Sequence, residues 1–598
     1  MNKVDSLTEN SFRVLLALMR TKGLCQRELA KAVGVSLGTA NALVRGLAEA
    51  GFIDEASKVL PAGRRALRPY KVDNAVIMAA GMSSRFAPLS YEKPKGVLVV
   101  KGEVLIERQI RQLQEAGIKD ITVVVGYMKE KFFYLQEKFG VDIVVNEDYY
   151  RYNNTSTLIR VLDRLKNTYI CSSDDYFTEN VFEPYVYQAY YAATYFPGPA
   201  NEWGLEFDRR GRITGIDHEP VDKWCMMGHV YFSAAFSKAF KELLVRQYER
   251  EEIKSNLWEH LFERNLKRLP MNVRKYSSEV IKEFDSLEEL RAFDDRYLEN
   301  ADSKIFSNIC RVLKCSERDI GGIEVLKQGM TNLSFKFTCH GEDYVYRHPG
   351  DGTEDYISRE SEAFSLGVAK RLGLDTTVVK IDAKTGWKIS KFISGARNLD
   401  YHKSSDVEGA IRLMRRLHDA KVRSRHAFDI WEKTLDFIRQ TSFAHKDFPD
   451  YGDLQSQMMK LHGAVVRRTQ TKPILCHCDC YAPNFLIDRK GEIVLIDWEY
   501  SGAADPGVDV GTFVCCSDYT EAEADDFLKR YHGGELKADD WFHDYAYIAL
   551  AAYYWFVWAV YQESRGNVVG EYLLLWYRMT KVYLKKANEF IKRKDGRR

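Results

Sequence analysis

The chain has 598 residues, and at roughly 100–200 residues per domain this length predicts about three to five folding units. Hydrophobic residues make up 45% and charged residues 29%, close to the average of globular proteins, which excludes disorder as the main state. The formal net charge of +2 excludes a protein that coats nucleic acid or a membrane along its whole length.

The cysteines and the N-terminal residues indicate a reducing compartment. The 11 cysteines are scattered without paired spacing, and the first residues lack the apolar core of a signal peptide. We therefore expect a cytoplasmic protein. Residues 545–561 are uncharged and have the minimum length of a bilayer span, but they include five tyrosines and two tryptophans. We expect a buried helix there, and no membrane insertion.

Residues 1–70 form the first predicted domain and carry 11 Lys and Arg against 6 Asp and Glu. Apolar residues at helical spacing predict short helices, with Gly34 at a turn and Ser36 capping the next helix. Residues 52–70 have the length of a two-stranded wing. The segment resembles the winged helix-turn-helix domains of bacterial regulators, which implies DNA contact, although such domains also dock proteins. The candidate contact residues are Thr39, Asn41 and Arg45 on the second helix and Arg64 and Arg65 on the wing.

Residues 71–300 alternate apolar strands with helical stretches, which predicts a parallel α/β, Rossmann-like fold that binds nucleotides. The strand at 74–80 runs into a loop of small residues whose backbone N–H groups can bind phosphates. The predicted nucleotide-binding residues of this loop are Ala80, Gly81, Met82 and Ser83. Arg85 and Lys95 follow, and their positive charges suit pyrophosphate as a leaving group.

Three carboxylates in this segment are candidate Mg²⁺ ligands. Asp174 follows the apolar strand 167–173, at the carboxyl end where α/β sheets bind ligands. Glu283 and Asp285 lie two residues apart, which places both on one face of an extended segment. The alternative is a solvated acidic pair in front of a helix that Asp285 or Ser286 caps.

The motifs of residues 74–290 resemble those of bacterial CTP:phosphocholine cytidylyltransferases. The resemblance rests on MAAGMSSRF, the PKG at 94–96, IERQI at 106–110, the Asn153-Asn154 pair, residues 201–203 and EFDS. It implies that Arg85 and Lys95 bind the phosphates of CTP and that Asp174, Glu283 and Asp285 hold Mg²⁺. It also implies that Asn154, Trp203 and Tyr231 contact phosphocholine. The family often has Asp-x-Asp near the metal, whereas this chain has Asp174-Asp175, so a role for Asp175 stays open.

Residues 301–598 begin with short β-like runs and end in long aromatic helices, which predicts a two-lobed α+β domain. His477, Asp479 and Asn484 have the spacing H-x-D-x-x-x-x-N, and Asp497 follows. In kinase-like phosphotransferases this order places a catalytic Asp, here Asp479, against the substrate hydroxyl. The Asn and the second Asp, here Asn484 and Asp497, hold Mg²⁺ on the nucleotide.

The residues upstream complete a kinase-like nucleotide site. Thr331 and Asn332 lie between strand-like runs and can cover the phosphates of ATP. Arg347 takes the place of the strand lysine of protein kinases, with Glu360 or Glu362 as its partner. We include Glu362 in the predicted nucleotide site. The arrangement resembles choline/ethanolamine kinases and the related aminoglycoside phosphotransferases, which implies a small alcohol as the substrate.

The long aromatic helix indicates which alcohol the kinase-like domain phosphorylates. Trp555 and Trp558 are three residues apart and share a helix face. They resemble the tryptophan pair that encloses the quaternary ammonium group in choline kinases, and Glu499 or Asp509 would add negative charge.

The sequence thus predicts a bifunctional enzyme that makes CDP-choline. A kinase domain at 301–598 converts choline and ATP to phosphocholine, and a cytidylyltransferase domain at 71–300 joins phosphocholine to CMP from CTP and releases pyrophosphate. Both steps would use Mg²⁺. One alternative is a kinase and nucleotidyltransferase for ethanolamine or a sugar. Another is a transcription regulator whose enzyme-like domains sense metabolites. No oligomeric state follows from the sequence.

Overall fold

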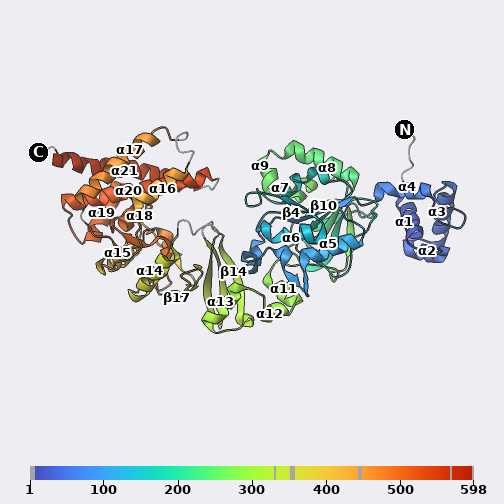
Figure 1. Ribbon diagram of the computed structural model, residues 1–598, viewed down its shortest axis with the longest axis horizontal. Helices are drawn as coiled ribbons and strands as arrows, with labels where there is room; N and C mark the ends of the chain where they lie inside the picture. Colours follow the sequence, from blue (N-terminus) through green and yellow to red (C-terminus); the bar gives the residue numbers. More distant parts are fainter. Residues whose placement is uncertain are drawn as a thin grey trace. The chain divides into compact units, whose positions relative to one another are not determined.

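A computed structural model describes residues 7–328, 332–350, 357–441, 448–469, 471–565 and 569–595. The chain divides into two compact units, Met1–Asn308 and Ile309–Arg598 (Figure 1). The first unit holds the N-terminal helices and a large α/β sheet. The second unit holds a smaller antiparallel sheet followed by a largely helical lobe. Boundaries at 70/71 and 300/301 stay predictions.

The N-terminal helices form a helix-turn-helix. The three helices α1 (Glu9–Arg20), α2 (Gln26–Val33) and α3 (Leu37–Glu49) bury Leu15, Leu29 and Leu47 in a shared core. Gly34 ends α2 in the left-handed conformation with φ at 73°. Ser36 caps α3, because its hydroxyl accepts a hydrogen bond from the Thr39 backbone N–H. The predicted turn and cap are confirmed.

The prediction of a two-stranded wing over residues 52–70 is wrong in part. One isolated antiparallel bridge joins Ile53 to Val59, and the chain then enters a further helix, α4 (Pro61–Leu67). Proline at the first helical position and the helix formers after it favour this outcome. Arg64 and Arg65 are exposed on α4 and not on a wing strand.

The α/β part of the first unit is built on a nine-stranded sheet with the order β10-β9-β11-β6-β1-β4-β5, and β8 and β12 pair off this path. Its core is parallel, with β1 between β4 and β6. The apolar cores of these strands are buried on both faces, as expected for a parallel sheet. The strands are β1 (Asn74–Ala79), β4 (Ile121–Val125), β5 (Asp142–Val145), β6 (Thr168–Ser172), β8 (Tyr190–Pro199), β9 (Gly204–Phe207), β10 (Ile213–Asp217), β11 (Val221–Phe232) and β12 (Asn272–Tyr276).

Helices and two short ribbons complete this unit. Antiparallel β7 (Asp175–Phe177) and β13 (Ile281–Glu283) pair so that Asp175 lies opposite Glu283, and β2 (Val99–Val100) pairs with β3 (Glu103–Val104). Residues more than 100 positions apart thus meet beside the carboxyl end of β6. The helices are α5 (Leu105–Glu115), α6 (Tyr134–Phe139), α7 (Asn154–Ile159), α8 (Ala234–Gln247), α9 (Glu251–Ser255), α10 (Trp258–Glu263), α11 (Leu287–Phe293) and α12 (Arg296–Glu299).

The second unit begins with an antiparallel sheet of five strands in the order β14-β15-β16-β18-β17. The strands are β14 (Ile320–Gln328), β15 (Asn332–Cys339), β16 (Glu342–Pro349), β17 (Val378–Ile381) and β18 (Lys388–Lys391). Helix α14 (Arg359–Arg371) lies between β16 and β17 in the chain, and α13 (Lys304–Leu313) contains the division between the units.

The helical lobe surrounds the small ribbons that carry the predicted catalytic loop. The ribbons are β19 (Arg397–Asn398), β20 (Ile474–Cys476), β21 (Phe485–Ile487), β22 (Ile493–Leu495) and β23 (Gly502–Ala504). The helices are α15 (Ser404–Asp419), α16 (Ile430–Gln440), α17 (Tyr451–Arg468), α18 (Gly507–Cys515), α19 (Glu521–His532), α20 (Ala538–Ser564) and α21 (Glu571–Asp595).

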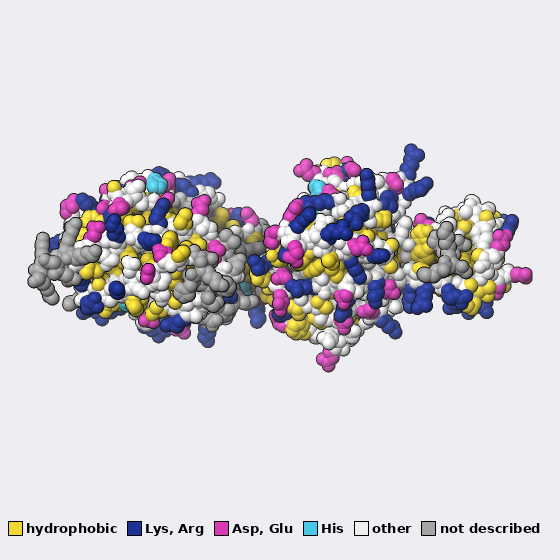
Figure 2. All heavy atoms as spheres, turned by 90° about the horizontal axis from the view of Figure 1, so that it is seen from above, with side chains coloured by type: hydrophobic (Ala, Val, Ile, Leu, Met, Phe, Trp, Pro, Cys, Tyr) yellow, Lys and Arg dark blue, Asp and Glu magenta, His cyan; other side chains and the backbone are white. Residues whose placement is uncertain are grey.

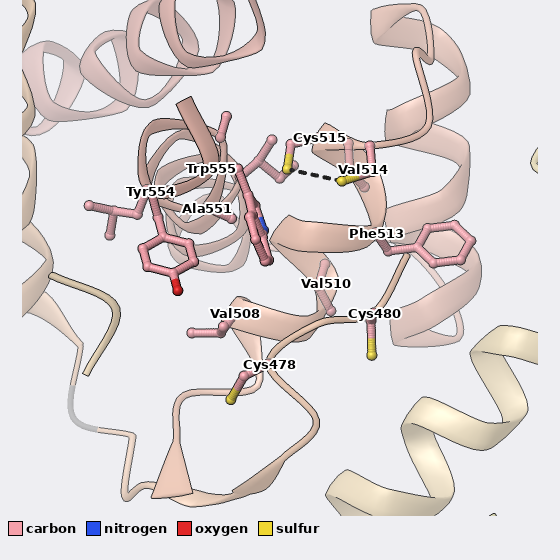
Figure 3. Packing of buried hydrophobic residues seen from close by; sticks show 14 of the residues in the cluster. Cys478, Cys480, Val508, Val510, Phe513, Val514, Cys515, Ala551, Tyr554 and Trp555 are labelled. Carbon is pink, nitrogen blue, oxygen red and sulfur yellow. Dashed lines mark hydrogen bonds between the residues drawn. The ribbon is translucent and has the colours of Figure 1, made fainter. Parts of the chain in front are cut away.

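Residues 545–561 lie within α20, which is largely buried between other helices. In Figure 3, Ala551, Tyr554 and Trp555 of this helix lie among the side chains of α18 and of the loop with Cys478. The aromatic run is therefore a core helix of the lobe. Within the described ranges, no helix combines the length and the apolar character that a bilayer span requires.

Candidate active sites

The phosphate loop of the first unit leaves the carboxyl end of β1. Ala80 is buried, and its carbonyl oxygen accepts a hydrogen bond from the Tyr127 backbone N–H at 3.1 Å. Gly81 is exposed, with open space beside its Cα atom. Ser83 has a φ of 46°, a left-handed conformation that is uncommon for a residue with a side chain. Because β1 and β6 are parallel neighbours, this loop and Asp174 leave the same edge of the sheet.

Lys95 and Arg85 meet the acidic residues at this edge. Lys95 is buried, and its Nζ lies 2.8 Å from Oδ2 of Asp174 and 3.7 Å from Oδ1 of Asp285. Arg85 is exposed, with one guanidinium nitrogen 3.2 Å from Oδ2 of Asp285. Burial alone would lower the pKa of Lys95, but the charges of Asp174, Glu283 and Asp285 raise it above its ordinary value. Lys95 therefore stays cationic at neutral pH.

Asp174, Asp175 and Glu283 form a group in which one carboxylate oxygen of each residue lies within 4.8 Å of the others. Neither buried oxygen of Asp175 has a hydrogen-bond partner among the described residues. Burial and the charge of Asp174 raise the pKa of Asp175 and of Glu283 well above the usual range. Three crowded carboxylates, of which Asp175 has no donor among the described residues, fit a divalent cation, which would remove this repulsion.

Asp285 lies outside this group of three. It follows the end of β13 and contacts Arg85 and Lys95 instead. Ser286 caps α11, with its hydroxyl accepting from the Glu289 backbone N–H. Asp175, whose role the sequence left open, is thus the third member of the group, and Asp285 as a metal ligand stays a prediction.

A cavity of about 330 Å³ adjoins these carboxylates. Its lining includes the predicted residues Asn154 and Trp203, and also Glu202 and Glu259. Glu259, on α10, accepts hydrogen bonds at 3.2 Å from Asn154 Nδ2 and from the Tyr191 hydroxyl. Burial raises the pKa of Glu259 to about 7, and burial together with Asp285 does the same for Glu202. Aromatic rings beside acidic groups suit a cationic head group.

Tyr231, also predicted to contact phosphocholine, is not at this cavity. It lies on β11 inside the sheet and is fully buried. Its ring packs against Tyr169 at 5.3 Å and Tyr190 at 6.0 Å between ring centroids. The structure therefore gives Tyr231 a core position.

In the second unit, hydrogen bonds join Asn484 to Asp479. Asn484 Nδ2 donates to Oδ2 of Asp479 at 2.9 Å and to its carbonyl oxygen at 2.8 Å. Asp509 is buried and accepts from the backbone N–H groups of His477 and Cys478, at 3.0 and 2.6 Å. Asp509 thus holds the predicted catalytic loop in place. Of the two acidic residues considered for contact with the substrate, Glu499 therefore remains.

The acidic groups of this site repel one another. Burial and the charge of Asp497 raise the pKa of Asp479 to about 8 and that of Glu499 to about 7. Asp497 itself has a φ of 65°, a strained conformation of the kind found at functional sites. A bound cation would relieve the repulsion among Asp479, Asp497 and Glu499.

Arg347 pairs with Glu362 and not with Glu360. Its two terminal nitrogens lie 2.6 and 2.7 Å from the two oxygens of Glu362, both groups being buried. Burial alone would raise the pKa of Glu362, but Arg347 and Lys388 lower it to about 2. Glu360 is exposed and contacts Arg425.

The residues predicted to cover the phosphates are only partly described. Asn332 begins β15, and its Nδ2 donates to Oε2 of Glu499 at 2.8 Å. Thr331 lies outside the described residues.

Trp555 and Trp558 stand next to this acidic site. Their ring centroids are 5.5 Å apart, and Trp576 of α21 stacks on Trp555 at 5.7 Å. Tyr500, three residues after Asp497, meets Trp555 edge-on at 6.1 Å. The aromatic cluster of these four residues therefore adjoins the loop that carries Asp497 and Glu499. Trp576 was not expected from the sequence.

Three family models match the chain. A winged helix-turn-helix DNA-binding model covers residues 7–54, a MobA-like NTP transferase domain covers 75–190, and the phosphotransferase enzyme family covers 322–543. Together with the folds described above, these matches confirm the predicted three-part arrangement. They define a transferase with a nucleotidyltransferase part and a kinase-like part behind a winged helix.

Individual proteins are similar to the nucleotidyltransferase part or to the kinase-like part of the chain. The chain is 34% identical over 229 residues to 2-aminoethylphosphonate cytidylyltransferase of Lancefieldella rimae, covering 38% of this chain and 93% of that protein. It is 31% identical over 221 residues to choline-phosphate cytidylyltransferase of Streptococcus pneumoniae, covering 37% of this chain and 96% of that protein. The structure of choline kinase LicA from Streptococcus pneumoniae is similar at 24% identity, over 47% of this chain and 97% of that one, with a TM-score of 0.41. The chain belongs to the same cytidylyltransferase family as the first two proteins.

Proposed function

We propose that the protein makes CDP-choline in two steps, phosphorylating choline with ATP and then transferring CMP from CTP to the phosphocholine. The observation that carries the choline part is the contact of Tyr500 and Trp555, which joins the aromatic cluster to the phosphotransfer loop. Aromatic faces attract a quaternary cation by ~0.5–2 kcal/mol each, and Glu499 adds negative charge.

In the kinase step, the hydroxyl oxygen of choline attacks the γ-phosphate of ATP, its proton passes to Asp479, and the bond to the β-phosphate breaks so that ADP leaves. The amide group of Asn484 holds Asp479 in place through two hydrogen bonds. Asn484 and Asp497 are the residues that would hold Mg²⁺, which supplies charge stabilisation to the phosphates. Arg347, fixed by Glu362, adds a second positive charge at the nucleotide.

In the cytidylyl step, an oxygen of the phosphocholine phosphate attacks the α-phosphate of CTP, and pyrophosphate leaves. Lys95 and Arg85 neutralise the phosphates at the end of β1. Asp174, Asp175 and Glu283 would hold Mg²⁺, whose charge favours the attack. Trp203 and Glu259 line the cavity proposed for the ammonium head.

The presence of a kinase-like part in the same chain favours a phosphate ester over a phosphonate as the acceptor of CMP. A kinase forms a new P–O bond on an alcohol, whereas 2-aminoethylphosphonate carries a P–C bond that phosphorylation of an alcohol does not produce. The relative that uses choline phosphate therefore supports the proposal better than the one that uses 2-aminoethylphosphonate.

A coupled assay of the full chain with Mg²⁺, ATP and CTP tests the proposal. Choline and ethanolamine are compared for ADP release, while phosphocholine, phosphoethanolamine and 2-aminoethylphosphonate are compared for pyrophosphate release. We expect choline and phosphocholine to give the highest kcat/KM. A preference for ethanolamine or the phosphonate would exclude choline, and absence of turnover with every substrate would favour a metabolite-sensing regulator.

Replacing Trp555 by phenylalanine is expected to raise the KM for choline by about tenfold and leave the KM for ATP unchanged, because the larger indole face attracts the cation more strongly. Steady-state kinetics of ADP release measures both constants. Trp541→Phe on the same helix is the matched control. Equal effects of the two substitutions would show that Trp555 only fills the core.

We also propose that the winged helix binds duplex DNA through α3 and α4. Arg45 on α3 and Arg64 and Arg65 on α4 are exposed and suit phosphate contacts. Figure 2 shows basic and acidic side chains interspersed over the visible face of the chain. Binding would therefore depend on this local set of arginines and not on the overall charge of +2.

The double substitution Arg45→Ala and Arg64→Ala is expected to weaken binding of the full chain to a random-sequence duplex. Each lost phosphate contact should reduce the slope of log K against log salt by about 1. Fluorescence anisotropy over a salt series measures the slope, with Arg13→Ala on α1 as the control. An unchanged slope would indicate that this domain docks a protein instead.

A further inference from the structure

A bulge in β11 brings a glycine against the ribbon of β7 and β13. β11 pairs with β8 on both sides of a register shift between Met226 and Val230, so the residues between them bulge out of the register. Gly228 lies in this bulge with a φ of 80°, a left-handed conformation that favours glycine. Beyond the bulge, Val230 pairs with Ile170 of β6, the strand that leads to Asp174.

Gly228 leaves room for β13 because it has no side chain. A Cβ atom at this position would lie 3.0 Å from Cγ2 and 3.3 Å from Cδ1 of Ile281, and 3.4 Å from Cε1 of Phe177. Both neighbours are buried, so neither can turn away into solvent. A side chain at position 228 would therefore push β13 away from β11 by a few tenths of an ångström or more.

The same ribbon sets the spacing of two carboxylates. In the antiparallel register of β13 and β7, Ile281 lies opposite Phe177 and Glu283 lies opposite Asp175. β13 has only three residues, so a displacement at Ile281 is carried to Glu283 at its other end. Mg²⁺ requires ligand oxygens in near-ideal octahedral positions at about 2.0–2.1 Å. A small displacement of Glu283 therefore weakens the cation site.

We propose that Gly228 is a positioning residue of the cytidylyl site. Without a side chain, it lets β13 pack against β11 and so places Glu283 beside Asp175. Gly228 acts on the cation site through Glu283. The proposal rests on the proposed cytidylyl function and adds to it a residue outside the group of carboxylates.

Hydrogen–deuterium exchange of the full chain without added metal tests the position of β13. Gly228→Ala is compared with Gly198→Ala on β8, where φ is 75° and a Cβ atom would have no neighbour within 4 Å. Both substitutions strain the backbone, but only Gly228→Ala adds the contact. We expect the amides of β7 and β13 to exchange about tenfold faster in Gly228→Ala and at the wild-type rate in Gly198→Ala. Wild-type exchange in Gly228→Ala would overturn the proposal.

Pyrophosphate release from CTP and phosphocholine tests the consequence for the cation site. In Gly228→Ala the Mg²⁺ concentration needed for half-maximal rate should rise about tenfold, whereas Gly198→Ala should match the wild type. A higher KM for phosphocholine with an unchanged Mg²⁺ requirement would overturn the proposal. The added methyl group would then only narrow the cavity that Gly228 also lines.

A second substitution separates the contact with β13 from the strain at φ. Ile281→Ala removes Cγ2 and Cδ1, so the double variant with Gly228→Ala should need less Mg²⁺ than Gly228→Ala alone. Ile281→Ala alone is the control, and losses that simply add would overturn the proposal.

Thermal unfolding checks the fold of each variant. Should Gly228→Ala not fold, the double variant decides: a folded protein whose Mg²⁺ requirement lies within about threefold of the wild type supports the proposal, and any other result overturns it. A wild-type chain that releases no pyrophosphate would contradict the cytidylyl function itself. The exchange rates of β7 and β13 would still decide the role of Gly228.

Discussion

Replacing Asp479 by asparagine is expected to lower kcat for choline phosphorylation by about 10²- to 10⁴-fold, the range of general-base catalysis. Asparagine keeps the size of the side chain, so the loop held by Asp509 should retain its shape. Its amide group, however, cannot accept the proton of the choline hydroxyl. Release of ADP from ATP and choline measures the effect.

Two controls separate this role from damage to the fold. Asp453→Asn, an exposed acidic residue on α17, should leave the rate unchanged. The Asp479→Asn protein should also release pyrophosphate normally from CTP and phosphocholine, because its cytidylyl site lies in the other compact unit. Phosphorylation at the wild-type rate in Asp479→Asn would contradict the assignment of the base.

The pH dependence of phosphorylation checks the same assignment. Burial and Asp497 raise the pKa of Asp479 to about 8, so the carboxyl is largely protonated at pH 6 and becomes a base as the pH rises. A bound cation near Asp497 favours the charged form and lowers this pKa. The acidic limb of the kcat profile should therefore lie at or below pH 8 and move to lower pH as Mg²⁺ increases.

Much of the fold follows from local patterns in the sequence. The apolar run at 74–80 and the helix start at Ser36 correspond closely to β1 and to the cap of α3. The wing was mispredicted because it was inferred from the length of the segment alone. Length does not distinguish two strands from a bridge followed by a short helix that begins at Pro61.

The candidate sites were less predictable where they depend on pairing between distant segments. Glu283 meets Asp175 only through the register of β7 and β13, which no local pattern reveals. Glu259 reaches Asn154 across 105 positions, and the only sequence signal is an acidic residue beside Trp258 in an apolar stretch. Tyr231 lies in β11, and the alternation of side chains along a strand does not show which face of the sheet is directed toward a ligand.

Replacing Asp174 by asparagine is expected to lower the rate of cytidylyl transfer by about a thousandfold, because a cation's stabilisation of the transition state is worth several kcal/mol. The substitution removes one ligand from the group with Asp175 and Glu283 and breaks the 2.8 Å ion pair with Lys95. Release of pyrophosphate from CTP and phosphocholine measures the loss.

Mg²⁺ dependence distinguishes a metal ligand from a partner of Lys95. With Asp174→Asn, the Mg²⁺ concentration needed for half-maximal rate should rise at least tenfold, because a neutral amide binds the cation more weakly than a carboxylate. Lys95→Met removes the ammonium group of the lysine but keeps the carboxylates. This substitution should lower the rate without raising the Mg²⁺ requirement. Asp163→Asn, on the exposed turn before β6, is the matched control. An unchanged Mg²⁺ requirement in Asp174→Asn would leave Asp174 as a partner of Lys95 alone and would place the cation on Asp175 and Glu283.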